Sequence, residues 1–315
     1  MSKRIKAFIG QSEPKATLNE ILTAREYAAK HKKRFLFPPL LMTGLSGCGK
    51  TALTERFADC LAEDGFIFEE VPVNSGWRYL ESLALKLDRA VGAVVFVDEA
   101  HEPSPIEEFL KLVINVREPR TFTRNGMDFR ADPTTQSWVF ASNEEVDPAL
   151  KRRCLEVVFS IYSPNEKKQL IQVMSEKEIA SDALEYFEGR IKPLAGDARN
   201  LCNRINLQPV DKVDLKLAKT IIQNMGLFPN GLVKKDLALM VRMSHAIGNR
   251  PTPVDTLKAS AGDVKTSATR NRLGWLMALE LIEIKRGGYS LTKKGNEYLT
   301  KLAELQATKK PKKAY

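Results

Sequence analysis

The sequence GLSGCGKT at residues 44–51 carries the strongest signal in this chain. It matches the pattern Gly-x-x-x-x-Gly-Lys-Thr and lies between a strand-like run at 40–43 and a helix-like run at 51–63. In that context the glycines let backbone N–H groups surround a β-phosphate, Lys50 reaches the β- and γ-phosphates, and the Thr51 hydroxyl takes a magnesium coordination position. The loop therefore predicts a site for ATP and Mg²⁺, formed by Gly44, Gly47, Cys48, Gly49, Lys50, Thr51 and Ala52.

A second motif, VVFVDE at residues 94–99, follows the loop. It has the pattern of a buried strand that ends in two carboxylates. Asp98 can support the Mg²⁺ ion, and Glu99 can polarise a water molecule, as phosphoryl transfer to water requires. A glycine-rich turn in an unrelated α/β domain is the alternative, and the ordered pair of motifs argues against it.

Composition limits the class of protein. A chain of 315 residues, 43% of them hydrophobic, is long enough for two or three domains. We find no signal peptide and no apolar run long enough to cross a membrane. The four cysteines are scattered, which is typical of free thiols in a reducing compartment, so we expect a cytoplasmic protein without a disulfide framework or zinc site.

The net charge of +10 is unevenly placed. Residues 226–315 contain 17 Lys and Arg against 7 Asp and Glu, whereas residues 1–225 contain 32 of each. This excess of positive charge in the C-terminal part indicates contact with a polyanion, and nucleic acid is the interpretation we favour. A solvated lysine-rich surface is the alternative, because four of the lysines lie at 309–313.

The chain alternates between strand-like and helix-like segments up to residue 161. The expected strands of a mostly parallel sheet are Leu40–Thr43, Ile67–Val73, Ala93–Val97, Ser137–Ala141 and Leu155–Phe159. Ser163 as N-cap, Pro164 and Glu166 then predict a helix start, and the pattern from there to Met225 is helical with no strand signal.

The C-terminal part has the element order of a winged helix-turn-helix. We expect helices at 233–247, 253–261 and 266–280, then a hairpin of 282–284 and 289–291. The third helix suits a major groove and the wing suits a neighbouring backbone. The predicted DNA contacts are Lys265, Arg270, Arg272, Lys285 and Arg286, while Trp275, Leu276 and Leu279 are expected in the core.

Three further features lie around the predicted site. Asn125-Gly126, between short alternating segments, predicts a β-hairpin that is either a contact for DNA or a partner, or only structural. Asn143 ends a central strand, where it can orient the attacking water. Arg152 and Arg153 are candidates for a cation supplied to a neighbouring subunit, and Arg199 can reach the nucleotide.

The ordered set resembles the AAA+ ATPases and, among them, the RuvB family of Holliday-junction branch-migration motors. The matching segments are Ile9-Gly10-Gln11, the phosphate loop, Val97 to His101, the Asn-Gly hairpin, Leu150 to Cys154, Gly196 to Arg199, and Pro253 to Leu257 with the wing around Arg286. Nearly the whole chain is covered.

The resemblance implies a role for each matching residue. Lys50 and Thr51 are the nucleotide and magnesium ligands, Asp98 supports magnesium and Glu99 is the catalytic base. Asn143 is the first sensor, Arg153 rather than Arg152 is the finger that acts on a neighbouring subunit, and Arg199 is the second sensor. Ile9 and Gly10 line the adenine pocket. The resemblance also implies a homo-hexameric ring on duplex or branched DNA, with a RuvA-type or loading partner left open.

We therefore predict an α/β chain: a P-loop AAA+ parallel-sheet domain at 1–161, an all-α lid domain at 162–226, a winged-helix domain at 227–302 and a basic disordered tail at 303–315. The expected activity is DNA-dependent ATP hydrolysis that drives branch migration or related duplex translocation in recombination and repair.

Two other functions stay open. Ser142-Asn143 and Arg152-Arg153-Cys154 are closer to clamp loaders, which favours a loader, although a basic winged helix is unusual in an ordinary clamp-loader subunit. A replication-initiator-like protein that uses ATP as a slow switch has the same layout of ATPase and winged helix. The Asp-Glu-Ala-His string also occurs in DEAH-box helicases, which need a second nucleotide-fold domain that this length excludes.

Overall fold

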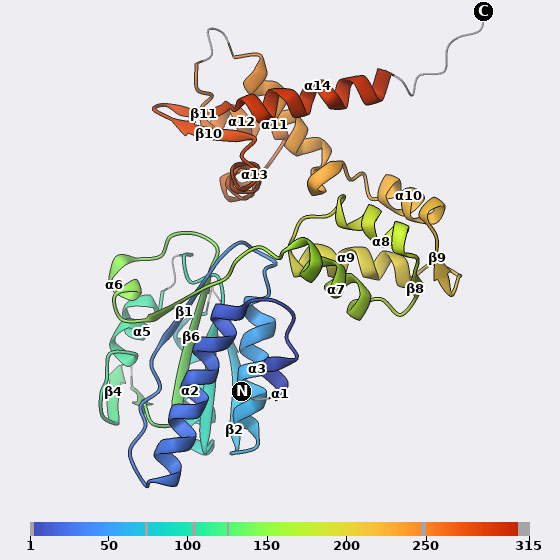
Figure 1. Cartoon of the computed structure of the whole chain (residues 1–315). Helices are drawn as coiled ribbons and strands as arrows, with labels where there is room; N and C mark the ends of the chain where they lie inside the picture. Colours follow the sequence, from blue (N-terminus) through green and yellow to red (C-terminus); the bar gives the residue numbers. More distant parts are fainter. Residues whose placement is uncertain (1–2, 73–74, 103–104, 125, 247–249, 308–315) are drawn as a thin grey trace, which may run out of the picture. The chain divides into compact units, whose positions relative to one another are not determined.

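The computed structural model describes residues 3–72, 75–102, 105–124, 126–246 and 250–307. The chain divides into two compact units, one of residues 1–176 with 193–203 and one of residues 177–192 with 204–315 (Figure 1). No helix in the described ranges is both long and apolar enough to cross a membrane. The predicted division into three domains and a tail stays a prediction, because residues 162–226 contribute to both units.

The first unit is built on a parallel five-stranded sheet in the order β2-β3-β6-β1-β7. All five predicted strands are present, with ends shifted by at most two residues. Their bounds are β1 Leu40–Thr43, β2 Phe66–Val71, β3 Gly92–Val97, β6 Gln136–Ser142 and β7 Leu155–Val158.

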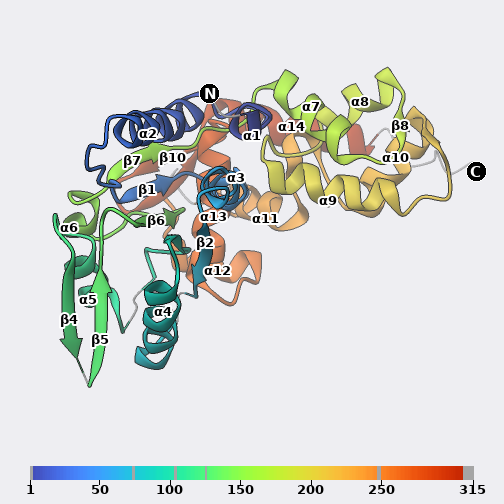
Figure 2. The same cartoon turned by 90° about the horizontal axis from the view of Figure 1, so that it is seen from below.

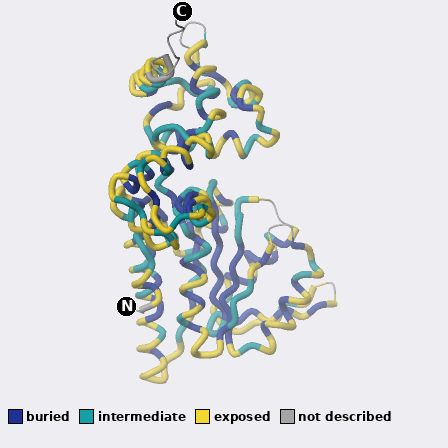
Figure 3. Tube along the Cα trace, turned by 90° about the vertical axis from the view of Figure 1, so that its right-hand side faces the viewer, coloured by how far each residue is buried: buried dark blue, intermediate teal, exposed yellow. Residues whose placement is uncertain are grey.

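Helices cover both faces of this sheet because alternate strand residues point to opposite sides. Leu40, Met42, Val94 and Phe96 pack on one face, and Leu41, Val95, Val97 and Phe140 pack on the other. The central strands are dark blue, hence buried, along their length in Figure 3. The first face is covered by α1 (Lys3–Lys6), α2 (Ser12–Lys30) and α3 (Lys50–Ala62), and the second by α4 (Trp77–Arg89), α5 (Glu107–Val113) and α6 (Pro148–Lys151).

Strand β6 lies between β1 and β3, and this order positions the site. Thr43 of β1 pairs with Ser142, and Val97 of β3 pairs with Phe140. Because the strands are parallel, their carboxyl ends meet at one edge of the sheet, where α/β proteins bind ligands. The phosphate loop, Asp98 and Asn143 each begin where one of these strands ends.

The predicted hairpin is formed by β4 (Arg120–Arg124) and β5 (Met127–Ala131), which lie side by side in Figure 2. Arg124 pairs with Met127, and Gly126 has φ +78°, as the turn requires, while Asn125 lies outside the described residues. Met127, Phe129 and Ala131 are buried, and Phe129 contacts Phe109 edge-on. The hairpin thus has one apolar face in the core and one polar face in solvent.

The helix start at Ser163 is confirmed. Helix α7 (Pro164–Met174) begins with a capping box, in which Glu166 N–H donates to Ser163 Oγ (3.3 Å) and Ser163 N–H donates to the Glu166 carboxylate (2.8 Å). The first part of α9 (Ala195–Asn206) belongs to the same unit, where the Cys202 thiol donates to Ile171 O.

The expectation of no strand between Ser163 and Met225 is wrong in detail. In the second unit β8 (Glu178–Ile179) and β9 (Lys212–Val213) form a parallel pair beside α8 (Ser181–Glu188) and α10 (Leu215–Asn224). Two-residue strands are too short to leave an alternating pattern in the sequence. A 3₁₀ turn, η1 (Pro229–Gly231), follows α10.

The winged helix is present in the second unit. Its elements are α11 (Lys234–Ser244), α12 (Val254–Ala261), α13 (Thr266–Ala278), β10 (Ile282–Lys285) and β11 (Gly288–Leu291). The predicted helix end at Ile247 lies outside the described residues. Thr252 and Tyr289 exchange backbone hydrogen bonds of 2.8 and 3.0 Å, which adds a bridge beside the wing. A side chain at Gly288 (φ +150°) would lie 2.3 Å from Thr252 O, so this approach requires glycine.

A last helix, α14 (Lys293–Ala307), corrects the predicted tail. The sequence suggested disorder from residue 303, but the helix continues to 307 before the described part ends. The Tyr298 hydroxyl donates to Pro229 O (2.8 Å), which ties this helix to the start of the winged-helix region.

Candidate nucleotide-binding and hydrolysis site

The phosphate loop has the backbone that the motif requires. Gly44, Gly47 and Gly49 have φ of +146°, +84° and +100°, a region that only glycine enters readily. A Cβ at Gly44 would lie 2.7 Å from Phe159 O, so the loop also has no room for a side chain there. Helix α3 begins at Lys50 directly after the loop, and its free N–H groups add to a concave set of donors suited to phosphate.

Lys50 is a buried cation with an incomplete set of partners. Its side chain is 8% exposed, and Nζ donates to Gly44 O (2.9 Å) and Leu45 O (3.3 Å). Among the described residues no carboxylate lies within ion-pair distance of it. A buried ammonium held only by carbonyls is poorly compensated, so Lys50 fits an anionic ligand in the loop.

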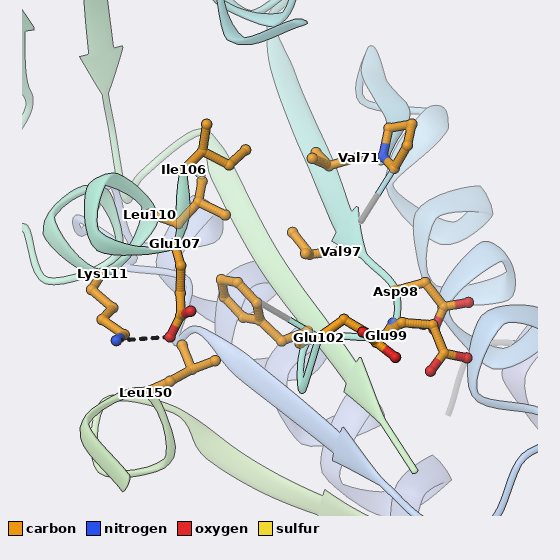
Figure 4. A pocket seen from close by; sticks show the side chains of 13 residues that line it. Val71, Val97, Asp98, Glu99, Glu102, Ile106, Glu107, Leu110, Lys111 and Leu150 are labelled. Carbon is orange, nitrogen blue, oxygen red and sulfur yellow. Dashed lines mark hydrogen bonds and ion pairs between the residues drawn. The ribbon is translucent and has the colours of Figure 1, made fainter. Parts of the chain in front are cut away.

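Asp98 and Glu99 lie at the carboxyl end of β3. The Asp98 carboxylate accepts the Glu99 N–H (2.9 Å), and Glu99 has φ +51°, a strained value for a residue with a side chain. Figure 4 shows both carboxylates at one side of a pocket, away from Ile106 and Leu110, which line its apolar part. The strained turn thus directs the two acids out of the core and toward the phosphate loop.

One pocket of about 400 Å³ brings most of the predicted residues together. Its walls come from the N-terminal segment, the phosphate loop, the end of β3, α7 and the start of α9, all within the first unit. The predicted residues that line it are Ile9, Gly47, Gly49, Lys50, Thr51, Ala52, Asp98, Glu99 and Arg199. Gly10, Gly44, Cys48 and Asn143 lie next to it without lining it.

Asn143 follows directly after β6, between the ends of β1 and β3. Its Oδ1 atom is buried and has no hydrogen-bond partner among the described residues. Buried amide oxygens are nearly always paired, so an unpaired one at this edge of the sheet is available to a ligand or a water molecule.

The sequence analysis assigned no role to three residues of this region: Phe8, Gln11 and Tyr162. Gln11 binds the backbone of Ser160 through both amide atoms (2.7 and 3.1 Å), and the Tyr162 hydroxyl donates to Cys48 O (3.0 Å). Burial raises the pKa of Tyr162 to about 12, so its hydroxyl stays protonated as a donor. The only sequence signal for Phe8 and Gln11 was their position beside or within Ile9-Gly10-Gln11. For Tyr162 it was the position just before the helix cap Ser163.

Gly10 and Cys48 have structural reasons for their identity. Gly10 has φ +68°, and a Cβ there would lie 2.7 Å from the Tyr162 ring. The Cys48 side chain is buried, and that burial raises the pKa of its thiol. Cys48 therefore contributes its backbone to the loop, and its thiol remains neutral.

Arg152 and Arg153 lie outside this pocket. They follow α6, whose first turn Asp147 caps through hydrogen bonds of 2.7 and 3.1 Å, and they line a separate hollow beside Phe37 and Trp138. Arg153 Nη1 donates to Ala149 O (2.7 Å) and Arg152 Nε to Pro148 O (3.2 Å). Both side chains are exposed, so either is free to meet another molecule.

The donor set fits Mg²⁺ only together with a nucleotide. Thr51 and Asp98 line the same pocket and offer a hydroxyl and a carboxylate, the oxygen ligands that Mg²⁺ accepts. In the described residues no group of three His, Cys, Asp or Glu could hold a metal. Mg²⁺ with one or two protein ligands normally completes its shell with phosphate oxygens and water.

The predicted DNA contacts divide into two groups. The exposed ones are Lys265 at the N-cap of α13, Arg270 on α13, and Lys285 and Arg286 on the wing. Arg272 instead donates to the fully buried Asp236 (2.9 Å) and to Asp263 (3.3 Å). Because both carboxylates lie inside the winged helix, Arg272 holds its helices together, and we do not propose it as a DNA contact. Of the predicted core residues, Trp275 and Leu276 are buried and Leu279 is half-buried.

Solved structures of Thermotoga maritima RuvB have the same fold. A structure described as the RuvB Holliday junction branch migration motor aligns with a TM-score of 0.78 at 20% identity, covering 95% of this chain and 97% of that one. A point variant of the same protein aligns with a TM-score of 0.79 at 20% identity, covering 95% and 98%.

This chain has a RuvB-like AAA+ fold. The predicted parallel sheet and the AAA+ fold class are thereby confirmed. No protein-family model and no curated protein matches the sequence. At 20% identity the likeness concerns the fold, and activity is a separate question.

Proposed function

We propose that this chain is an ATP-hydrolysing motor on DNA, of the kind that drives branch migration of Holliday junctions. The observation that supports it best is the single pocket that unites the phosphate loop, Asp98, Glu99 and Arg199. A pocket that only binds a nucleotide has no need of a second, partly exposed acid beside the one that supports the metal. The RuvB-like fold, with a basic winged helix after the nucleotide-binding part, supports DNA as the molecule that the motor moves.

In this proposal each residue of the pocket has a role in cleaving the γ-phosphate. Lys50 and the loop amides bind the phosphates, and Thr51 and Asp98 hold Mg²⁺, which neutralises phosphate charge when bound. Glu99 accepts a proton from the attacking water as the new phosphorus–oxygen bond forms and the bond to the β-phosphate oxygen breaks. Asn143 orients that water, and Arg199 contacts the phosphates from α9.

The position of Arg153 supports assembly into a ring. Its guanidinium lies outside the pocket of its own chain, and it is exposed. In a homo-hexamer each subunit would supply Arg153 to the γ-phosphate of its neighbour, where such an arginine stabilises the transition state. Lys265, Arg270, Lys285 and Arg286 would contact the DNA backbone.

Steady-state ATP hydrolysis tests the proposal. It is measured without DNA, with linear duplex and with a four-way junction, with Glu99→Gln as the inactive control. We expect stimulation by duplex or junction, and a fall in kcat of about 10²–10⁴-fold in the control. Hydrolysis by Glu99→Gln at the normal rate would refute the role of this site.

A loader or an ATP switch is the second candidate. Asn143 after Ser142, and Cys154 after two arginines, favour the loader, whereas the switch shares the layout of an ATPase followed by a winged helix. Slow hydrolysis that no DNA stimulates would support the switch over the motor.

A further inference from the structure

His101 connects the proposed catalytic acid to the neighbouring strand, and no role has been assigned to it. Its Nε2 lies 3.3 Å from the Glu99 carboxylate and its Nδ1 lies 3.1 Å from Ser142 Oγ. The imidazole is 9% exposed, whereas the Glu99 side chain is 44% exposed. A buried ring therefore holds one oxygen of a carboxylate that remains accessible to water.

The hydrogens of this network follow from the acceptors. An ionised carboxylate can only accept, so Nε2 of His101 carries the hydrogen that faces Glu99. Ser142 Oγ donates its single hydrogen to Glu144 O (2.6 Å), so towards Nδ1 of His101 it can only accept. The same oxygen also accepts the Glu144 N–H (3.1 Å). His101 is thus oriented on its far side by a serine that is itself fixed by the backbone.

The network includes both chain neighbours of Asn143. Ser142 and Glu144 flank it in the chain, and Ala100 N–H donates to Ala141 O (2.8 Å), which fixes the backbone of the His101 segment to the end of β6. Glu99 has φ +51° and lies outside any helix or strand, so regular secondary structure does not fix the direction of its side chain. Strand β6, which ends directly before Asn143, therefore also sets the position of Glu99.

We propose that His101 is a positioning residue that holds the Glu99 carboxylate in its reactive orientation and couples it to the end of β6. The proposal rests on the proposed function, since it needs Glu99 to act on water. Residues that orient a catalytic ligand or base through one hydrogen bond typically contribute about 10–100-fold to activity.

Two substitutions of nearly equal size separate this role from simple packing. His101→Gln places an amide N–H where Nε2 lies and keeps a donor for Glu99. His101→Asn places its amide where Nδ1 lies, so it reaches Ser142 and leaves Glu99 without a donor. We expect His101→Asn to lower kcat for ATP by about 10–100-fold with KM within about twofold of the wild type, and His101→Gln to recover most of the loss.

The full-length variants are compared by steady-state ATP hydrolysis, by binding of a fluorescent ATP analogue and by thermal melting. A wild-type kcat in His101→Asn, equal losses in both variants, or a raised KM at constant kcat would each overturn the proposal. If His101→Asn does not fold, Ser142→Ala decides: a lower kcat at unchanged KM supports the proposal, and an unchanged kcat overturns it.

The same experiment contains the test of the proposed function. If the wild type hydrolyses ATP and Glu99→Gln does not, the proposed function holds and the result for His101 stands by itself. If the wild type is inactive, or Glu99→Gln remains active, the proposed function fails and the proposal for His101 falls with it.

Discussion

Arg153 is the residue whose role depends most on a neighbouring subunit. It is exposed and lies outside its own chain's nucleotide pocket. We expect Arg153→Ala to lower kcat by about 10³-fold or more while ATP binding is spared, because the arginine stabilises charge only in the transition state. Arg152→Ala is the matched control and should hydrolyse ATP normally.

Mixing inactive subunits tests whether Arg153 acts in a neighbour. Arg153→Ala and Glu99→Gln subunits each keep the group that the other lacks. Where the two meet at an interface, one intact site forms, so the mixture should recover part of the activity that neither has alone. Normal hydrolysis by Arg153→Ala, or an inactive mixture of subunits that assemble, would contradict the assignment.

At the scale of elements, the phosphate loop depends on one glycine more than on the others. Gly44 combines φ +146° with a distance of 2.7 Å between an added Cβ and Phe159 O. We expect Gly44→Ala to cost about 1–3 kcal/mol in the loop conformation, which corresponds to about 5- to 150-fold weaker ATP binding.

The matched control for Gly44 is Gly76→Ala. Gly76 has an ordinary φ of −95°, and an added Cβ there meets nothing within 4 Å. Calorimetric or fluorescence titration with ATP compares the two variants. Equal affinities in both would show that the loop conformation of Gly44 does not limit binding.

The winged helix contains a charged cluster that gives it a pH dependence. The Asp263 side chain is 3% exposed and accepts from Lys235, Thr269 and Arg272 at 3.0–3.3 Å. Burial alone would raise its pKa, but these donors outweigh burial and lower the pKa. Because the folded pKa lies below the unfolded value of about 3.9, the stabilisation is complete above that value and is lost as pH falls through the folded pKa.

We therefore expect Asp263→Asn to lower the free energy of unfolding of the winged helix by about 1–3 kcal/mol at pH 7. The difference from the wild type should shrink below about pH 4. Urea unfolding is followed by Trp275 fluorescence after Trp77→Phe and Trp138→Phe. Glu280→Gln, which removes an exposed pair with Lys294, is the control and should change stability by less than about 0.5 kcal/mol. A difference that stays constant down to about pH 3 would contradict the role of the carboxylate.

At the scale of the whole molecule, the net charge of +10 lies in residues 226–315. If the wing binds phosphates, Lys285→Ala with Arg286→Ala should weaken duplex binding and reduce the slope of log K against log salt by about 1.8, or about 0.9 for each phosphate that is no longer neutralised. Lys216→Ala with Lys219→Ala removes the same charge from exposed positions on α10 and should leave the slope unchanged. Equal effects of the two pairs would indicate non-specific attraction.

The sequence by itself determined the local chemistry and the element order. Glycine spacing in the phosphate loop, the apolar run before Asp98 and the Ser163 capping box each depend on residues close together in the chain, so their patterns are readable without a structure. The five strands and the wing were predictable for the same reason, since periodic burial and turn residues are local properties.

Only the tertiary structure decided which residues meet. The strand order places β6 between β1 and β3, and this brings Ser142 and Asn143 beside the phosphate loop and Glu99, although they are distant in sequence. The partners of Tyr162, His101 and Arg272 are likewise set by packing between remote segments. No local pattern encodes such contacts, because they depend on how the sheet and helices assemble around a shared core.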